Sequence, residues 1–177
     1  MPRLFTGIKI PAEIGQQLAR LQFGLEGARW IDPANFHITL RFVGDVDAAT
    51  ADDFADRLDD VSSMPFSLSL HSLGAFGNKN PRMVWAGVAP APELEALHKA
   101  HEQAAQRAGL KPEGRKFTPH VTIARMRSGR AEDVARYLSM NGDFTSQQFE
   151  VEAFSLFSAR LSRGGGPYVV ECDYLLG

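Results

Sequence analysis

The chain has 177 residues, of which 44% are hydrophobic and 23% charged, with a formal net charge of −2, which indicates one ordinary domain with ample material for a core. The slightly acidic balance argues against a protein that binds nucleic-acid duplexes mainly by charge, and no apolar run approaches the roughly 18 to 20 residues of a membrane span. Cys172 is the only cysteine, so a disulfide framework is excluded. Because the beginning of the sequence is too short and too charged for a signal peptide, we expect a cytoplasmic protein that makes no membrane contact.

The first half of the chain predicts three strands that alternate with two helices. Pro11 and Glu13 precede and open the first helical pattern, as residues of these types commonly do at helix starts. The expected elements are a strand at 3–10, a helix at 12–26, a strand at 36–43, a helix at 48–61 and a strand at 66–73. The turn-rich stretch "GNKNPR" at 77–82 is expected to connect the two halves.

The second half predicts the same order of elements and one additional strand. Its first helix carries apolar side chains at helical spacing, with His101 on the same stripe. The expected elements are a strand at 83–88, a helix at 92–108, a strand at 117–124, a helix at 130–140, a strand at 148–157 and a final strand at 168–175.

The two halves also resemble each other in sequence. "PRLFTGIKIPAE" at 2–13 resembles "PRMVWAGVAPAPE" at 81–93, and the 29 positions from His37 to Phe66 are matched by 29 from His120 to Phe149. Such a repeat indicates an internal duplication. We expect a single domain, 1–177, made of two pseudo-symmetric lobes near 1–78 and 79–177, with a final strand that can cross between them.

Each half carries a His-x-Thr pair inside an apolar strand, in "HITLRF" at 37–42 and "HVTIAR" at 120–125. Alternate residues of a strand point to opposite faces. Alternation therefore predicts two polar faces, formed by His37, Thr39 and Arg41 in the first strand and by His120, Thr122 and Ala124 in the second. One such pair is common on a half-exposed strand, but equivalent pairs in a duplicated chain favour a cleft that both histidines line.

Two other kinds of site compete with a histidine pair. A metal site needs three or four converging ligands, commonly with carboxylate or thiolate among them, and neither motif has an acidic residue at a useful spacing. His98 and His101 lie one helical turn apart, which is more typical of a solvated helix face. The sequence lacks the Gly-x-Ser-x-Gly motif that is usual for nucleophilic catalysis by serine, and Cys172 lies in an ordinary alternating strand.

Acid–base chemistry fits the pattern better and requires no metal. The ordinary pKa of histidine, about 6.5, allows one imidazole to be neutral and another protonated near neutral pH. The neutral ring removes a proton from an attacking oxygen, and the charged ring delivers one to a leaving oxygen. Threonine hydroxyls, with Arg125 five residues after His120, are suited to hold phosphoryl oxygens. The pattern therefore predicts a phosphodiesterase.

With these motifs the chain resembles the two-histidine (2H) phosphoesterases, and more narrowly the LigT-like bacterial RNA 2′,3′-cyclic phosphodiesterases, also called 2′-5′ RNA ligases. The segments that carry the resemblance are "HITL" and "HVTI" with their flanks "RW", "RFVGDV", "KFTPHVTIAR" and "LFSARLSRGGGPYVV". The resemblance implies an α+β, bilobal, duplicated fold, in which two antiparallel sheets face each other across a V-shaped central cleft with helices outside.

The same resemblance implies hydrolysis of RNA 2′,3′-cyclic phosphate ends to a 2′-phosphate. His37 would be the general acid that protonates the leaving 3′ oxygen and His120 the general base that activates water, while pseudosymmetry leaves the reverse order open. Thr39, Thr122 and Arg125 would hold the phosphate. A 5′-hydroxyl in place of water would explain reversible 2′-5′ ligation. No metal, cofactor or obligate protein partner is implied, and we expect a monomer.

Other residues are candidates for contact with RNA. The basic side chains expected to guide its backbone are Arg115, Lys116, Arg127 and Arg130, of which Arg127 also fits a solvated position. The side chains on which a terminal base can stack are Phe42, Trp30 and Phe117, and Phe42 and Phe117 also fit the core. Arg160 and Arg163 flank the last turn and are candidates for closing over substrate.

Three rival functions remain open. The first is a 2′,5′-oligonucleotide or small cyclic nucleotide phosphodiesterase in the same cleft, which the two motifs do not distinguish. The second is an RNA-end binding protein without catalysis, against which the two intact histidines argue. The third is an RNA-binding module that works mainly by charge, against which the acidic balance argues.

Overall fold

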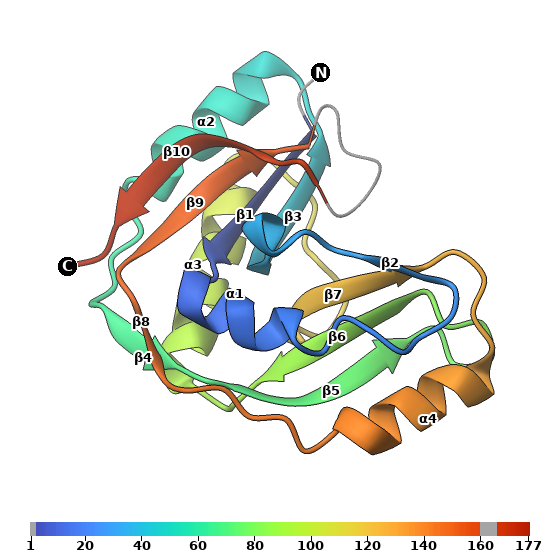
Figure 1. The fold of residues 1–177 in the computed structure, drawn as a ribbon. Helices are drawn as coiled ribbons and strands as arrows, with labels where there is room; N and C mark the ends of the chain where they lie inside the picture. The colour runs from blue at the N-terminus through green and yellow to red at the C-terminus, as the bar shows by residue number, and fades with distance from the viewer. Residues whose placement is uncertain (1–2, 160–165) are drawn as a thin grey trace.

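The fold is described by a computed structural model over residues 3–159 and 166–177 (Figure 1). It is an α+β fold with antiparallel strands, which confirms the predicted class. In chain order the elements are β1 (Arg3–Lys9), α1 (Ala12–Ala19), β2 (Ala28–Trp30), a short 3-10 helix η1 (Pro33–Asn35), β3 (His37–Asp45), α2 (Ala48–Leu58), β4 (Phe66–Leu68), β5 (Leu70–Phe76), β6 (Met83–Val88), α3 (Pro92–Arg107), β7 (His120–Met126), α4 (Ala131–Asn141), β8 (Phe149–Val151), β9 (Ala153–Ser158) and β10 (Val169–Leu175).

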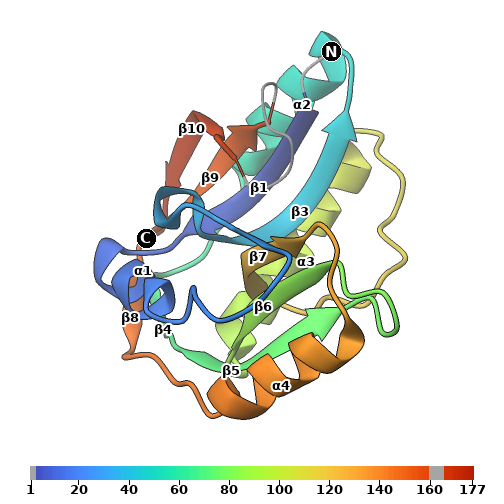
Figure 2. The ribbon, with the colours of Figure 1, turned by 45° about the vertical axis from the view of Figure 1, so that its right-hand side comes forward.

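The strands form one large sheet and one small one. The large sheet runs β10-β9-β1-β3-β7-β6-β5, with β2 added on β7, and β4 pairs with β8 in the small sheet. Two separate facing sheets were expected. Instead, the groups β10-β9-β1-β3 and β7-β6-β5 are joined by β3 and β7, which pair at one position, Ile38 with Val121, before they diverge (Figure 2).

The strand order reflects the sequence repeat. On one side of the β3–β7 junction lie β3 and then β1, which both come from the first repeat. On the other side lie β7 and then β6, which both come from the second repeat. The last strand of each repeat then lies in the opposite group, because β5 pairs with β6 and β9 pairs with β1. The two strand groups therefore differ from the expected halves 1–78 and 79–177.

The crossing occurs where a predicted strand is broken in two. The single strands expected at 66–73 and 148–157 are interrupted at Ser69 and Glu152, where neither residue is in a strand. Before each break the chain belongs to the small β4–β8 sheet, and after it to the large sheet. The interruption allows one repeat to contribute a strand to the other group.

The first helix is shorter than predicted, and two short elements follow it. The helix ends at Ala19 instead of continuing to 26, and Gly24, inside the expected range, has a φ of +75° that is incompatible with a helix. Gln22 then donates hydrogen bonds from Nε2 to the carbonyl oxygens of Ile31 (2.7 Å) and Ile123 (3.1 Å). These bonds join the end of β2 to β7, with which β2 pairs. Sequence periodicity missed both β2 and η1.

Helices pack on the strand groups and complete the core. α3 contacts β3 and α2, while α4 contacts β5 (Figures 1 and 2). Ile38 of β3 and Val121 of β7 are fully buried in this core. None of the helices in the described ranges has the length and apolar character that a membrane crossing requires.

Candidate active site

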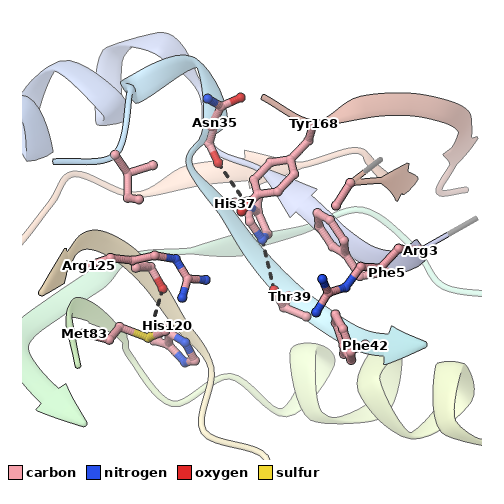
Figure 3. A pocket seen from close by; sticks show the side chains of 13 residues that line it. Arg3, Phe5, Asn35, His37, Thr39, Phe42, Met83, His120, Arg125 and Tyr168 are labelled. Carbon is pink, nitrogen blue, oxygen red and sulfur yellow. Dashed lines mark hydrogen bonds between the residues drawn. The ribbon is translucent and has the colours of Figure 1, made fainter. Parts of the chain in front are cut away.

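A cavity of about 430 Å³ lies between the two strand groups, beside the β3–β7 junction (Figure 3). Both His-x-Thr pairs and Arg125 contribute side chains to it. Its lining residues are Arg3, Phe5, Ile31, Asn35, His37, Thr39, Phe42, Met83, His120, Thr122, Arg125, Ala159 and Tyr168. The cavity therefore brings together the five residues that the sequence predicted for catalysis and phosphate binding.

His37 is held in one tautomer by its neighbours on the chain. Its Nδ1 lies 2.9 Å from the carbonyl oxygen of Asn35, which can only accept, so Nδ1 carries the proton. Nε2 then accepts a hydrogen bond from the Thr39 hydroxyl at 3.0 Å. The rings of Phe5 and Tyr168 pack on the imidazole with centroid distances of 4.9 and 5.1 Å. Nε2 is therefore the nitrogen available for proton transfer.

His120 is held in the same way by the other repeat. Its Nδ1 donates to the carbonyl oxygen of Thr118 at 2.6 Å, which leaves Nε2 as its basic nitrogen. Phe76 and Trp85 frame this ring at centroid distances of 5.1 and 5.9 Å. Two imidazoles with matching tautomers therefore line one cavity.

Burial favours the neutral form of both imidazoles. Burial lowers the pKa of His37 to about 4; the bond to Asn35 opposes the shift, and the charges of His120 and Arg125 add to it. Burial also lowers the pKa of His120, against a weaker opposing effect of the bond to Thr118. Because charge on His120 affects His37, the two rings belong to one electrostatic site.

In each central strand the β-bulge nearest the histidine sets which residues reach the cavity, and β3 has a second bulge at Val43. Opposite β1, Thr6 pairs with Arg41 and Gly7 with Thr39, so Leu40 is an extra residue. Opposite β6, Ile123 is extra in the same way. Each bulge places two consecutive side chains on the buried face and reverses the alternation after them.

The bulges correct three expected side-chain positions. Arg41 and Ala124 were expected beside the histidines, but they are 6% and 0% exposed on the buried face. Phe42, expected on the apolar face, instead lines the cavity and is 43% exposed. Phe42 and Arg125 occupy equivalent places, each five residues after its histidine.

The cavity is suited to an anion. Arg125 has a buried Nε without a hydrogen-bond partner among the described residues. Arg3 also lines the cavity, with its guanidinium 5.8 Å above the Phe42 ring. The described lining residues include no Asp or Glu. Thr122 donates only to the weakly accepting sulfur of Met83 at 3.3 Å, so its hydroxyl is readily redirected to a ligand.

The remaining basic candidates lie outside this cavity. The described lining does not include Arg115, Lys116, Arg127 or Arg130. Arg115 forms an exposed ion pair with Glu113 at 3.2 Å. Arg160 and Arg163 lie outside the residues that the structure describes.

The other aromatic candidates and the His98–His101 pair also lie outside the cavity. Trp30 packs against Tyr137 (6.0 Å between centroids), and Phe117 stacks on His98 at 3.8 Å, so neither lines the cavity. The expectation of a solvated His98–His101 face is wrong for His101, which is 0% exposed and bonded through Nδ1 to the Thr6 hydroxyl at 2.9 Å. No group of three or more His, Cys, Asp or Glu in the described ranges is arranged to hold a metal ion.

Sequence reasoning missed several residues of the site. Arg3, Phe5 and Met83 come from the strands that flank β3 and β7, and Tyr168 comes from the segment before β10. Arg3 lies in the Pro-Arg repeat that opens each half, which was a usable signal. Tyr168 had none, because its place depends on β10 pairing with β9 far from His37 in sequence.

Comparisons with known proteins agree with this geometry. The family model described as LigT like Phosphoesterase matches residues 8–85 and 87–168. A protein of Aeropyrum pernix named RNA 2′,3′-cyclic phosphodiesterase is 36% identical over 141 residues, covering 78% of this chain and 80% of that protein. One of the same name from Aquifex aeolicus is 30% identical over 183 residues, covering 99% and 97%. The crystal structure of E. coli LigT complexed with 3′-AMP matches with a TM-score of 0.84 and 27% identity, over 99% of each chain.

Proposed function

Because the chain belongs to the family of LigT-like phosphoesterases, we propose that it hydrolyses RNA 2′,3′-cyclic phosphate ends to 2′-phosphates by acid–base catalysis, without a metal. The observation that carries this proposal is the pair of imidazoles from the two repeats, each with Nδ1 bound to a backbone carbonyl, beside an arginine whose Nε has no partner in the described chain. The names of the relatives supply the substrate class.

The two sides of the cavity differ, which supports an orientation for the substrate. Phe42 and Arg3, with Phe5 and Tyr168, surround the His37 side, whereas Arg125 lies on the His120 side (Figure 3). An exposed aromatic ring under a guanidinium is suited to stack a base. We therefore place the nucleoside beside Phe42 and the attacking water beside His120.

This orientation assigns the two histidines. In a 2′,3′-cyclic phosphate the leaving oxygen O3′ belongs to the ribose, so the group that protonates it lies on the nucleoside side. Nε2 of His120 removes a proton from water, whose oxygen attacks phosphorus as the P–O3′ bond breaks. Nε2–H of His37 delivers its proton to O3′. Each positioned proton transfer contributes roughly 10² to 10⁴ in rate.

The phosphate is held by groups whose present partners are easily replaced. Thr39 and Thr122 donate to His37 Nε2 and to a thioether, and both hydroxyls can turn to the non-bridging oxygens. Arg125 adds a charge-assisted contact, which is stronger in a cavity that excludes water. These donors would stabilise the negative charge that builds on the phosphoryl group during attack.

One observation favours the reverse assignment. Burial lowers the pKa of His37 to about 4, whereas a general acid must carry a proton before it reacts. The negative charge of a bound phosphate raises the pKa of both imidazoles, and the orientation above decides which of them gains more from it. If His37 were the base, the nucleoside would lie on the Arg125 side.

The proposal extends to longer and to different substrates. Arg115, Lys116, Arg127 and Arg130 would contact RNA beyond its terminal nucleotide, outside the cavity. A 5′-hydroxyl in place of water would attack the same phosphorus, and as the P–O3′ bond breaks it would join RNA through a 2′-5′ linkage. A 2′,5′-oligonucleotide or small cyclic nucleotide is the alternative substrate, and turnover compared across these classes separates them.

A single incubation tests the proposed function. The protein is mixed with RNA ending in a 2′,3′-cyclic phosphate in excess EDTA, and the phosphate isomer at the new end is identified. The expected product is the 2′-phosphate, formed at the same rate with and without EDTA. A 3′-phosphate product would contradict the position of the leaving oxygen, and activity only after added divalent metal would contradict the metal-independent mechanism.

A further inference from the structure

A partly buried ion pair joins β3 to α3 on the face of β3 that points away from the cavity. Arg41, 6% exposed, donates from Nε to Oε2 of Glu102 on α3 at 2.8 Å and from Nη2 to Oε1 at 3.2 Å. The same guanidinium donates from Nη1 to the Phe42 carbonyl and from Nη2 to the Lys111 carbonyl, both at 2.6 Å. One side chain therefore joins a cavity strand, a helix and the loop that follows that helix.

The equivalent place in the other repeat contains no charge. Ala124 follows the second bulge as Arg41 follows the first, and it is 0% exposed. The second bulge therefore forms without an ion pair, with only an apolar side chain at this position. Because burial of a charged pair carries a large desolvation cost, and apolar replacements are often equally stable, the fold itself gives no reason for Arg41 at this position.

The ion pair holds the backbone of β3 and of the loop that precedes His120. On the β3 side, the bond to the Phe42 carbonyl holds the backbone of the exposed ring. On the other side, Glu102 Oε1 accepts from the Glu113 amide at 2.8 Å, and Arg41 holds the Lys111 carbonyl. This loop leads to Thr118, whose carbonyl sets the tautomer of His120.

We propose that Arg41 and Glu102 form a positioning pair, which holds Phe42 at the nucleoside side of the cavity and the loop before His120 at the other, so that the enzyme favours cyclic phosphates that carry a base. This inference rests on the proposed function. Neither residue touches substrate; both act through Phe42 and through the loop 109–119. Without the pair, no donor holds the carbonyls of Phe42 and Lys111, so the Phe42 ring and the loop lose their fixed positions.

The test compares two substrates that differ only in the base. These are adenosine 2′,3′-cyclic phosphate and ribose 2′,3′-cyclic phosphate, and the readout is the ratio of their kcat/KM values. Glu102→Gln keeps the shape of the side chain and removes its charge. We expect the ratio to fall by about tenfold, mainly through KM of the adenosine substrate, since stacking on an aromatic ring carries an effect of this order.

The chain offers a matched control and a variant that separates positioning from stability. Asp53→Asn makes the same chemical change in the exposed Arg57–Asp53 pair on α2 (2.9 Å) and should leave the ratio unchanged. The double variant Arg41→Leu with Glu102→Leu replaces the pair by apolar side chains, so its melting temperature should recover. Its ratio should stay low, because no donor reaches the carbonyls of Phe42 and Lys111.

The outcomes separate the two proposals. If the wild type hydrolyses neither substrate, the proposed function fails. If the wild type favours the adenosine substrate and Glu102→Gln or the stable double variant keeps that preference, the pair is only structural and the positioning inference is overturned. A lowered ratio in both variants, with Asp53→Asn unchanged, supports it.

Discussion

Four histidines, His37, His98, His101 and His120, lie where burial lowers the pKa of the imidazole. Of these four residues, His37 and His120 line the cavity. In His101 the lowered pKa has a different consequence, because that ring is enclosed between α3 and the sheet, with Phe154 edge-on at 4.4 Å. Its environment makes folding sensitive to acid without any role in the proposed reaction.

The pH dependence of stability has a definite sign at His101. Its pKa is about 3 in the folded chain, against about 6.5 when unfolded, so the unfolded state binds the proton first as pH falls. Stability is complete above pH 6.5 and decreases progressively between pH 6.5 and pH 3. For this residue alone we expect a loss of up to about 2 kcal/mol between pH 6.5 and pH 5.

Urea denaturation at pH 7.5 and pH 5 checks this prediction. The variant is His101→Leu combined with Thr6→Val, which removes the hydroxyl partner as well and copies the apolar Val84 of the other repeat. Its loss of unfolding free energy between the two pH values should be smaller than that of the wild type. An identical loss in both proteins would show that His101 does not carry the effect.

At the scale of elements, the β1–β3 pairing positions the first histidine motif. Gly7 lies opposite Thr39, next to the bulge, and a Cβ there would meet the carbonyl oxygen of Ile38 at 2.7 Å and the ring of His37 at 3.4 Å. The first distance is shorter than a real Cβ contact, so the backbone of β3 would have to move. The absence of a side chain at residue 7 therefore allows β1 to approach β3 where His37 begins the strand.

Substitution of this glycine should affect stability and turnover together. Gly7→Ala must move backbone of β3, and we expect a loss of about 1–3 kcal/mol in unfolding free energy, with a reduced kcat from a displaced His37. Thermal unfolding and turnover of the cyclic substrate measure the two effects. Gly114→Ala is the matched control, since a Cβ there has open space. Equal behaviour of the two variants would contradict the account of this contact.

The bulges mark the limit of sequence reasoning about elements. The strands, their order and the His-x-Thr pairs were predicted because local periodicity carries that information. Strict alternation nevertheless placed Arg41 and Ala124 beside the histidines, and Phe42 on the apolar face. An extra residue in a ladder depends on the partner strand, which periodicity within one segment does not report. The equal five-residue offset of Phe42 and Arg125 from their histidines was the available signal.

At the scale of the whole molecule, both sequence repeats contribute residues to one cavity. His37 and His120 lie 83 positions apart in sequence, and they share a cavity because β3 and β7 meet at the centre of the strand order. The repeat spacing predicted that the two motifs are equivalent. It did not predict the exchange of β5 and β9 between strand groups, because the edge that a strand joins is decided by contacts remote in sequence. That exchange ties the two groups together on both sides of the cavity.

The claim that the two repeats supply opposite proton transfers to one phosphorus is tested most directly by His37→Ala and His120→Ala on two substrates. One is a nucleoside 2′,3′-cyclic phosphate, and the other carries sulfur in place of O3′. With oxygen, each variant should lose roughly 10² to 10⁴ in kcat. With sulfur, whose thiol has an ordinary pKa of about 8.5 and leaves without protonation, His37→Ala should recover most of its rate while His120→Ala does not. Full activity of either variant on the oxygen substrate, or recovery of His120→Ala instead of His37→Ala, would contradict the account.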